Sequence, residues 1–376
     1  MSLAAVATRV WPFFVLSYPV APPLRPDSFP NSQYYEVGLL DGLFILGWSV
    51  LWVLMREGVM RLFKPIARRR LLALSLSQRA ARAGASDATT NGHAATKSKT
   101  DGMGNGHSTA VQNGSTHEWS RERKSSMDVS PSASRTRRET MRAQAREKKV
   151  TRFAEQGWSV FYYSIFWTYG MYIHISLPTY PFNTDALWEG FPHYPLPSPI
   201  KAYYLLQFAF WITQLVTINV EARRKDHWQM LTHHIITLAL VAASYISGFT
   251  RAGCLVLVLL DLCDILLSLA KMLKYLEYAV LPDVIFVAFL VTWLVTRQVL
   301  YFKVAYSTTF DARKVTTFEW DPSNGKFESG IQYGCSAALW VLGVLLCIWF
   351  GMICRVAYRV ITGKGAEDTR SDDEDE

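Results

Sequence analysis

The stretch of sequence that decides the fold is Gln229–Leu269, which reads QMLTHHIITLALVAASYISGFTRAGCLVLVLLDLCDILLSL. It contains two apolar runs, Gln229–Ile246 and Ala252–Leu269, joined by a short connection. Each run approaches the roughly 20 helical residues that cross the hydrocarbon core of a bilayer. A backbone in lipid must satisfy its own hydrogen bonds, so both runs are predicted to be membrane helices, antiparallel to each other.

Five further apolar runs of similar length extend this pattern in both directions. The composition agrees with a membrane protein, because 50% of the residues are hydrophobic and only 19% are charged. We therefore predict an all-α polytopic membrane protein with about seven transmembrane helices. The additional runs are Glu36–Met55, Gly157–Leu177, Ile200–Val220, Pro282–Tyr301 and Tyr333–Val356.

Basic residues set the expected orientation, because they stay on the cytosolic side of a membrane. Arg56, Arg61 and Lys64 follow the first run, whereas the segment Pro178–Pro199 contains no Lys or Arg. The N-terminus is therefore predicted to be lumenal and the C-terminus cytosolic. The segment Val304–Gln332, which precedes the last run, is then also a lumenal loop.

The net charge of +8 is unevenly distributed along the chain. Residues 64–152 include 19 basic and 7 acidic residues, whereas residues 366–376 include one basic and seven acidic residues. The membrane bundle is thus nearly neutral, and nucleic-acid binding is not expected. The segment Leu72–Val150 has few large apolar residues and is predicted to be disordered. The expected divisions are a lumenal segment (1–35), a first transmembrane helix (36–55), a basic, largely disordered cytosolic loop (56–152), a six-helix catalytic domain (153–360) and an acidic, disordered cytosolic tail (361–376).

His233, His234, Asp261 and Asp264 are ionisable residues inside the two central runs. Such groups are costly in lipid and usually mark a functional site. With a rise of 1.5 Å per residue, His234 and Asp264 each lie about 7.5 Å from the cytosolic end of their run, and Asp261 shares a helix face with Asp264. The histidines and Asp264 are therefore expected to meet on the cytosolic side, with Asp261 about one turn deeper.

A histidine that is oriented by a buried carboxylate acts as a general base, so these residues favour a reaction site. We expect Asp264 to orient the histidine and Asp261 to hold the substrate. The alternative is that the four residues only form hydrogen bonds between helices. The histidines are too few for a di-iron centre, and neither a metal nor a cofactor is expected.

The same region resembles the Lag1 motif of ceramide synthases, which belong to the TLC (TRAM/LAG/CLN8) family of membrane proteins. The similarity extends over about Gly157–Tyr358, and the long linker and acidic tail resemble those of a fungal or other lower-eukaryote member. The stretches that carry it are Gln207–Trp211, Glu221–Trp228, His233–Thr237, Ser244–Tyr245, Arg251–Gly253, Asp261–Asp264 and Ala270–Tyr275.

The resemblance implies six transmembrane helices within residues 157–356, arranged around a central cavity in the endoplasmic reticulum membrane. It also implies an enzyme that transfers a fatty acyl group from acyl-CoA, a substrate and not a cofactor, to a sphingoid base such as sphinganine or phytosphingosine. The products would be (dihydro)ceramide and CoA. The family's histidine and aspartate pairs correspond to His233, His234, Asp261 and Asp264.

Two chemical routes are open for the histidines. Either one of them takes a proton from the amine, or one attacks the thioester and forms an acyl-imidazole that the amine resolves. Arg223, Arg224 and Lys225 follow the third run on the cytosolic side, where they would bind the CoA phosphates or only fix the topology. Family members select the acyl length partly through the loop before the last run, here within Val304–Gln332.

Three residues match kinase patterns. Ser126 and Thr140 each end an Arg-x-Arg-x-x-Ser/Thr pattern of basophilic kinases, and Ser371 precedes acidic residues, as sites of acidophilic kinases do. Phosphorylation of these residues is expected to tune activity.

The expected partners are acyl-CoA, a sphingoid base, membrane lipids, these kinases, and a second copy of the chain or a small single-span regulatory subunit. One rival interpretation is a non-catalytic TLC protein that senses or transports lipid. The other is a seven-transmembrane receptor, which is disfavoured because the chain lacks Asp-Arg-Tyr after the third run and Asn-Pro-x-x-Tyr in the last.

The sequon Asn113-Gly114-Ser115 tests the predicted orientation. Because the loop that holds it is predicted to be cytosolic, we expect no glycan at Asn113. Gel mobility with and without a glycosidase checks this in the expressing cell. A glycosidase-sensitive mass shift that disappears when Asn113 is replaced would contradict the orientation.

Overall fold

The computed structural model describes residues 11–96, 131–220, 226–319 and 327–362. The chain divides into two units. The first comprises Met1–Arg61 with Glu155–Glu376, and the second comprises Leu62–Ala154. Each unit is described separately.

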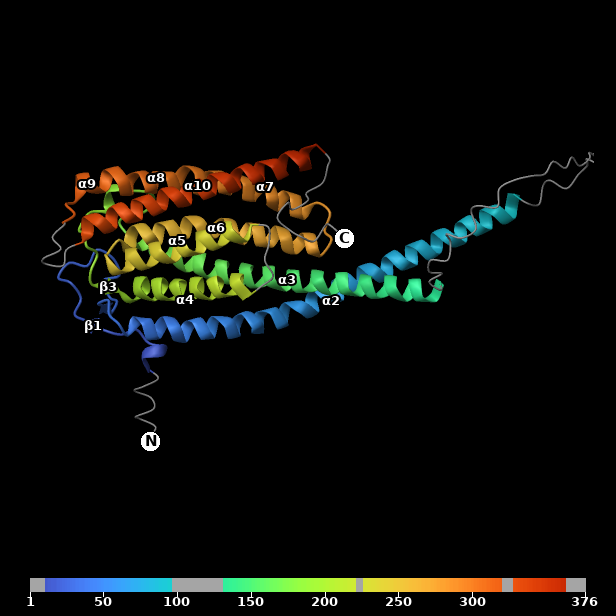
Figure 1. Ribbon diagram of the computed structural model, residues 1–376, viewed down its shortest axis with the longest axis horizontal. Coiled ribbons are helices and arrows are strands. Elements are labelled where there is room, and N and C mark those ends of the chain that lie inside the picture. The colour runs from blue at the N-terminus through green and yellow to red at the C-terminus, as the bar shows by residue number, and fades with distance from the viewer. Residues whose placement is uncertain (1–10, 97–130, 221–225, 320–326, 363–376) are drawn as a thin grey trace, which may run out of the picture. The chain divides into compact units, whose positions relative to one another are not determined.

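The first unit is a bundle of long helices in which successive helices run in opposite directions (Figure 1). The predicted all-α polytopic membrane fold is confirmed, because the described residues contain five helices that are long and apolar enough to cross a membrane. The long helices are α2 (Asp41–Thr96), α3 (Pro131–Ser176), α4 (Ser198–Val220), α5 (His227–Ile246), α6 (Thr250–Tyr275), the run from α7 to α9 (Leu281–Val315) and α10 (Glu328–Ile361).

The five apolar helices are Asp41–Ala81, His227–Ile246, Thr250–Tyr275, Leu281–Val315 and Glu328–Ile361. The other two predicted crossings, Gly157–Leu177 and Ile200–Val220, are also helical, within α3 and α4. Their many Tyr, Trp and Gln residues make them less apolar than the five. Seven crossings and the orientation of the chain remain predictions.

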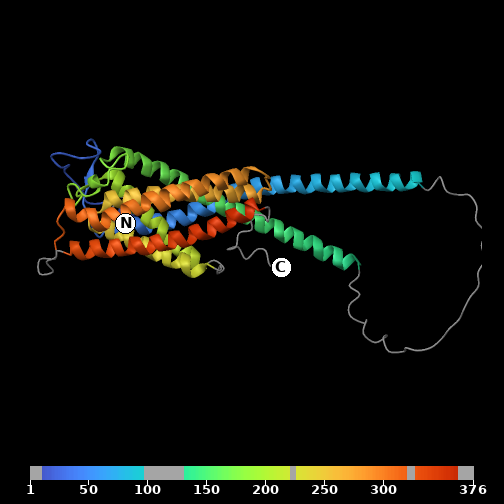
Figure 2. The ribbon, with the colours of Figure 1, turned by 90° about the horizontal axis from the view of Figure 1, so that it is seen from above.

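The helix Leu281–Val315 is longer than the sequence predicted. It consists of α7 (Leu281–Trp293), the π-helical turn η3 (Leu294–Leu300), α8 (Tyr301–Tyr306), a second π-helical turn η4 (Ser307–Asp311) and α9 (Ala312–Val315). Figures 1 and 2 show it as one continuous run in orange. The prediction that a loop begins near Val304 was therefore wrong. The polar residues there are compatible with a helix because Thr308 and Thr309 donate hydrogen bonds to the carbonyl groups one turn earlier.

In the second unit, the described part of the segment 56–152, which was predicted to be largely disordered, is helical. Within it, α2 extends to Thr96 and α3 begins at Pro131. Val150 and Ala67 are fully buried, and the rings of Phe63 and Phe153 meet at a tilted angle with centroids 6.0 Å apart. The prediction considered only how little apolar surface this segment can bury, whereas its Ala, Arg, Glu and Gln residues are strong helix formers.

A small cap covers the end of the bundle where α2 and α4 begin (Figure 1). We use the term for residues 11–40 and 177–199. Its three short strands, β1 (Pro19–Val20), β2 (Tyr34–Tyr35) and β3 (Leu196–Pro197), form an antiparallel sheet in the order β1-β2-β3. Two segments that are far apart in sequence thereby become one surface layer.

A buried ion pair ties this cap to the bundle. The Lys201 ammonium lies 2.8 Å from the Asp41 carboxylate, and both side chains are buried. Lys201 also donates hydrogen bonds to the carbonyl groups of Ser17 and Glu36. The Tyr245 hydroxyl donates to the other oxygen of Asp41 at 2.8 Å. The interaction therefore joins α2, α4 and α5 to the N-terminal part of the cap.

Arg251, at the start of α6, ties the rest of the cap to the bundle. Its guanidinium donates to the carbonyl groups of Ala186 and Glu189, at 2.6 and 2.9 Å, and pairs with Asp27. Burial, and then the nearby Arg251 charge, lower the pKa of His193 to about 4. The His193 ring is thus neutral at pH 7, and Arg251 supplies the positive charge of this region.

The Lys201→Met substitution tests how much the buried ion pair contributes to stability. Leaving a buried carboxylate without its partner should lower the free energy of unfolding by roughly 3–5 kcal/mol. Arg68→Met is the matched control, because it removes the cation of an ion pair with Glu147 in which both side chains are half exposed. Thermal unfolding in detergent should fall clearly for Lys201→Met and stay close to wild type for Arg68→Met, and equal effects would contradict this view.

Candidate active site

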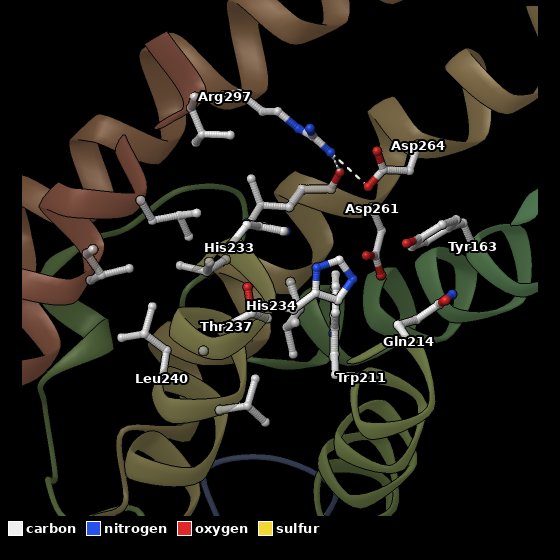
Figure 3. A pocket seen from close by; sticks show the side chains of 18 of the residues that line it. Tyr163, Trp211, Gln214, His233, His234, Thr237, Leu240, Asp261, Asp264 and Arg297 are labelled. Carbon is white, nitrogen blue, oxygen red and sulfur yellow. Dashed lines mark hydrogen bonds and ion pairs between the residues drawn. The ribbon is translucent and has the colours of Figure 1, made fainter. Parts of the chain in front are cut away.

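A cavity of about 360 Å³ lies inside the helical bundle. His233 and His234 from α5 and Asp261 and Asp264 from α6 all line it (Figure 3). The short turn between α5 and α6 makes these helices antiparallel neighbours, which brings the two pairs to the same depth. The structure thus brings together the four residues that the sequence singled out.

The cavity has a polar end and an apolar arm, with the histidines between them. The polar end lies near the last turns of α4, and the apolar arm extends along α5, α6 and α10 toward the cap. Such a shape suits a molecule with a polar head and a hydrocarbon tail. The polar end is lined by Arg56, Glu155, Gln156, Ser159, Gln214 and Thr217, and the arm by Leu240, Val241, Val256, Leu257, Leu339 and Leu342.

The backbone of α5 fixes the protonation of His234. The Nδ1 atom of His234 lies 2.6 Å from the carbonyl oxygen of Met230, one turn earlier. Because a carbonyl oxygen can only accept a hydrogen bond, Nδ1 of a neutral His234 carries the proton. The Nε2 atom is then left with its lone pair and is the basic nitrogen of the ring.

Aromatic rings hold both imidazoles in position. The Trp211 ring lies edge-on to His233 and His234, with centroids 5.8 and 5.4 Å away. Trp349 meets the other side of His233 at 5.3 Å. The Nδ1 atom of His233 is buried and has no hydrogen-bond partner among the described residues. His233 is therefore fixed by packing, whereas His234 is also fixed by a hydrogen bond.

Asp264 does not orient a histidine, in contrast to the prediction. Its carboxylate pairs with the guanidinium of Arg297, from η3, at 2.9 Å (Figure 3). Arg297 also donates to the Leu260 carbonyl and stacks on the Trp293 ring, 4.3 Å from its centroid. A guanidinium attracts a buried carboxylate more strongly than a neutral imidazole does, which explains the choice of partner.

Asp261 is held by a chain of neutral hydrogen bonds. Gln207 of α4 donates to the Asp261 carboxylate at 3.0 Å, and the Tyr162 hydroxyl of α3 donates to the Gln207 carbonyl at 2.7 Å. All three side chains are almost completely buried. Asp261 therefore retains accepting capacity toward the cavity that it lines.

Arg297 and Gln207 are site residues that the sequence analysis missed. Both lie within predicted membrane crossings. The rule that selected the aspartates, namely that ionisable side chains inside an apolar run are functional candidates, applies equally to Arg297. Limiting the rule to the two central runs excluded Arg297, and limiting it to ionisable groups excluded Gln207.

Thr140, the one other predicted site residue within the described part of the chain, does not line this cavity. Thr140 is an exposed residue of α3, and its phosphorylation stays a prediction. The remaining predicted residues of this kind, Ser126 and Ser371 for phosphorylation, Arg223, Arg224 and Lys225 for CoA binding, and Asn113 for the absent glycan, lie outside the described residues.

Comparison with known proteins identifies a family domain in the same part of the chain that forms most of the cavity. Residues 152–355 match the TRAM/LAG1/CLN8 family model, which describes a TLC domain. The chain is 43% identical over 231 residues to sphingosine N-acyltransferase lag1 of Schizosaccharomyces pombe, a match that covers 61% of this chain and 59% of the relative.

Two further relatives show how far the similarity extends. The chain is 41% identical over 259 residues to the sphingosine N-acyltransferase-like protein ALT7 of Alternaria alternata, covering 61% of this chain and 60% of the relative. It is 32% identical over 239 residues to ceramide synthase 5 of Homo sapiens, covering 61% and 57%. The chain thus spans less than two thirds of the length of the curated relatives it matches. The family model matches more than half of the chain and includes the helices that line most of the cavity. The chain therefore belongs to the TRAM/LAG1/CLN8 family of TLC-domain membrane proteins.

Proposed function

We propose that this protein is a ceramide synthase of the endoplasmic reticulum membrane, which transfers a fatty acyl group from acyl-CoA to the amine of a sphingoid base. The observation that carries the proposal is the position of a histidine pair and two aspartates between the polar end and the apolar arm of one cavity. The names of the relatives, sphingosine N-acyltransferase and ceramide synthase, point to the same reaction.

The cavity offers a place for each part of the substrates. The acyl chain would lie in the apolar arm, where it is shielded from water. The thioester would then lie beside the histidines, and the CoA moiety would extend through the polar end. Arg56 lines that end and is a candidate contact for CoA phosphates, together with the predicted Arg223, Arg224 and Lys225.

His234 is the proposed general base. The amine nitrogen of the sphingoid base attacks the thioester carbon, a C–N bond forms and the C–S bond breaks. The proton that the nitrogen loses passes to Nε2 of His234, which is the free nitrogen of the ring, and then to the departing CoA sulfur. The Met230 carbonyl, rather than a carboxylate, fixes the tautomer that this step requires.

Asp261 is proposed to bind the amine or a hydroxyl group of the sphingoid base, because its carboxylate lines the cavity. Asp264 and Arg297 would act as a positioning pair that keeps α6 and η3 in register around the site. The alternative route, in which His233 forms an acyl-imidazole, is distinguished by incubation with acyl-CoA alone, since only that route leaves a covalent acyl group on the protein.

Alanine substitution of the histidines tests the proposal. Purified protein is supplied with sphinganine and palmitoyl-CoA, and amide formation is measured by mass spectrometry. Loss of the base should lower the turnover of His234→Ala by at least about 100-fold. His227→Ala is the matched control, because His227 lies on the same helix, is buried and does not line the cavity. Wild-type-like turnover in both His233→Ala and His234→Ala would contradict the assignment and favour a non-catalytic lipid-binding protein.

The two aspartates should respond differently to replacement by asparagine. Asp261→Asn can still accept the hydrogen bond of Gln207, so stability should change by less than about 1 kcal/mol while turnover falls. Asp264→Asn leaves the Arg297 charge unpaired and should lower the free energy of unfolding by roughly 3–5 kcal/mol.

A double-variant cycle checks the origin of that loss. Adding Arg297→Gln to Asp264→Asn removes the unpaired charge, so part of the stability should return. Thermal unfolding in detergent measures it. If the double variant is less stable than Asp264→Asn by the full cost of Arg297→Gln alone, the two residues do not act as a pair.

A further inference from the structure

We propose that Trp188 forms the floor of the apolar arm and limits the length of the acyl chain that the protein transfers. The inference rests on the proposed function, because it assigns the arm to the acyl chain. Trp188 belongs to the cap and directly follows the short helix η2 (Asp185–Leu187). Its side chain is only 1% exposed, and it lines the cavity.

The indole of Trp188 is anchored at the cap end of the cavity. Its Nε1 atom donates a hydrogen bond to the Ser307 hydroxyl, the first residue of the π-helical turn η4, at 2.9 Å. One side of the ring meets Phe249 edge-on, with centroids 6.2 Å apart. Trp188 and Phe249 belong to one buried cluster with Ala252 and Val304. A ring that is held on several sides is a fixed wall and not a mobile side chain.

The arm that ends at this wall is long enough for an alkyl chain. His234 and Ser244 both line the cavity and are ten residues apart on α5, which corresponds to about 15 Å along the helix. Beyond the histidines and Asp261, toward the cap, the lining residues are mostly aliphatic and aromatic, and none of them is charged. Each methylene group that finds room in such an arm improves binding by roughly fourfold. A methylene that meets the floor gains nothing, so the floor sets the preferred length.

The floor also includes residues of Val304–Gln332, the segment through which family members were expected to select the acyl length. Val304, Thr308 and Gln332 line the same end of the cavity, and Gln332 donates to the Thr308 carbonyl at 2.6 Å. Acyl-length selection would therefore depend on two segments that meet at η4. Trp188 should limit the acyl length more than Val304, Thr308 and Gln332 do, because its indole is the bulkiest of these side chains.

Trp188→Leu is the direct test. Purified protein receives an equimolar mixture of acyl-CoAs, from palmitoyl-CoA to lignoceroyl-CoA, and the chain lengths of the products are compared. The smaller side chain should deepen the arm and raise the ratio of very-long-chain to long-chain products by at least about tenfold, which corresponds to about two methylene groups.

Trp340→Leu is the matched control. Its indole also donates to a hydroxyl of η4, that of Thr309 at 3.0 Å, but the side chain is exposed and does not line the cavity. The product ratio of this variant should equal that of the wild type. An equal shift in both variants would show that loosening η4, and not deepening the arm, changes the selection, and would overturn the proposal.

Two further variants keep the test decisive if Trp188→Leu does not fold. Trp188→Phe retains an aromatic ring but is shorter, so it should shift the products in the same direction by a smaller factor. Ala252→Leu adds volume at the same end and should shift them toward shorter chains. An unchanged product profile in folded Trp188→Phe and Ala252→Leu would refute the inference. Absence of amide products from the wild-type protein would instead refute the proposed function.

Discussion

The structure depends on one constraint, which is that a charge inside an apolar bundle must have a partner. Asp264 with Arg297 joins α6 to η3, and Asp41 with Lys201 joins α2 to α4. Because separation of either pair would leave a bare charge in a low-dielectric interior, each pair fixes both the rotation and the depth of its helices. The first pair lines the cavity, and the second ties the cap to the bundle.

Within this frame, neighbouring polar groups perform separate tasks. The Met230 carbonyl sets the tautomer of His234, a role that a carboxylate has in many hydrolases. Neither aspartate is therefore needed to orient the base. Asp264 is engaged by Arg297, and Asp261 is supported by neutral donors and retains its capacity to accept. The site thus separates a structural charge from one that is available to a substrate.

The sequence was sufficient for the helices of the bundle and for the four central residues of the site. Apolar runs must be helical in lipid, and a charged residue within one is conspicuous. The partner of Asp264 was not predictable, because η3 is far from α6 in sequence and only packing brings Arg297 to it. The cap strands were also missed, since two-residue strands have no periodicity. The helices within residues 56–152 were missed because disorder was judged from burial alone, although local helix propensity acts without burial.

The two π-helical turns of Leu281–Val315 give this helix a further property. A π turn accommodates an extra residue, and each residue of an α-helix advances by about 100°, so side chains after such a turn face a different direction from those before it. Arg297, in η3, contacts Asp264, and Ser307, the first residue of η4, contacts Trp188. The two π-helical turns therefore each hold one contact, the first with the proposed reaction centre and the second with the proposed end wall. A single insertion or deletion between the two turns would rotate one contact by about 100° relative to the other.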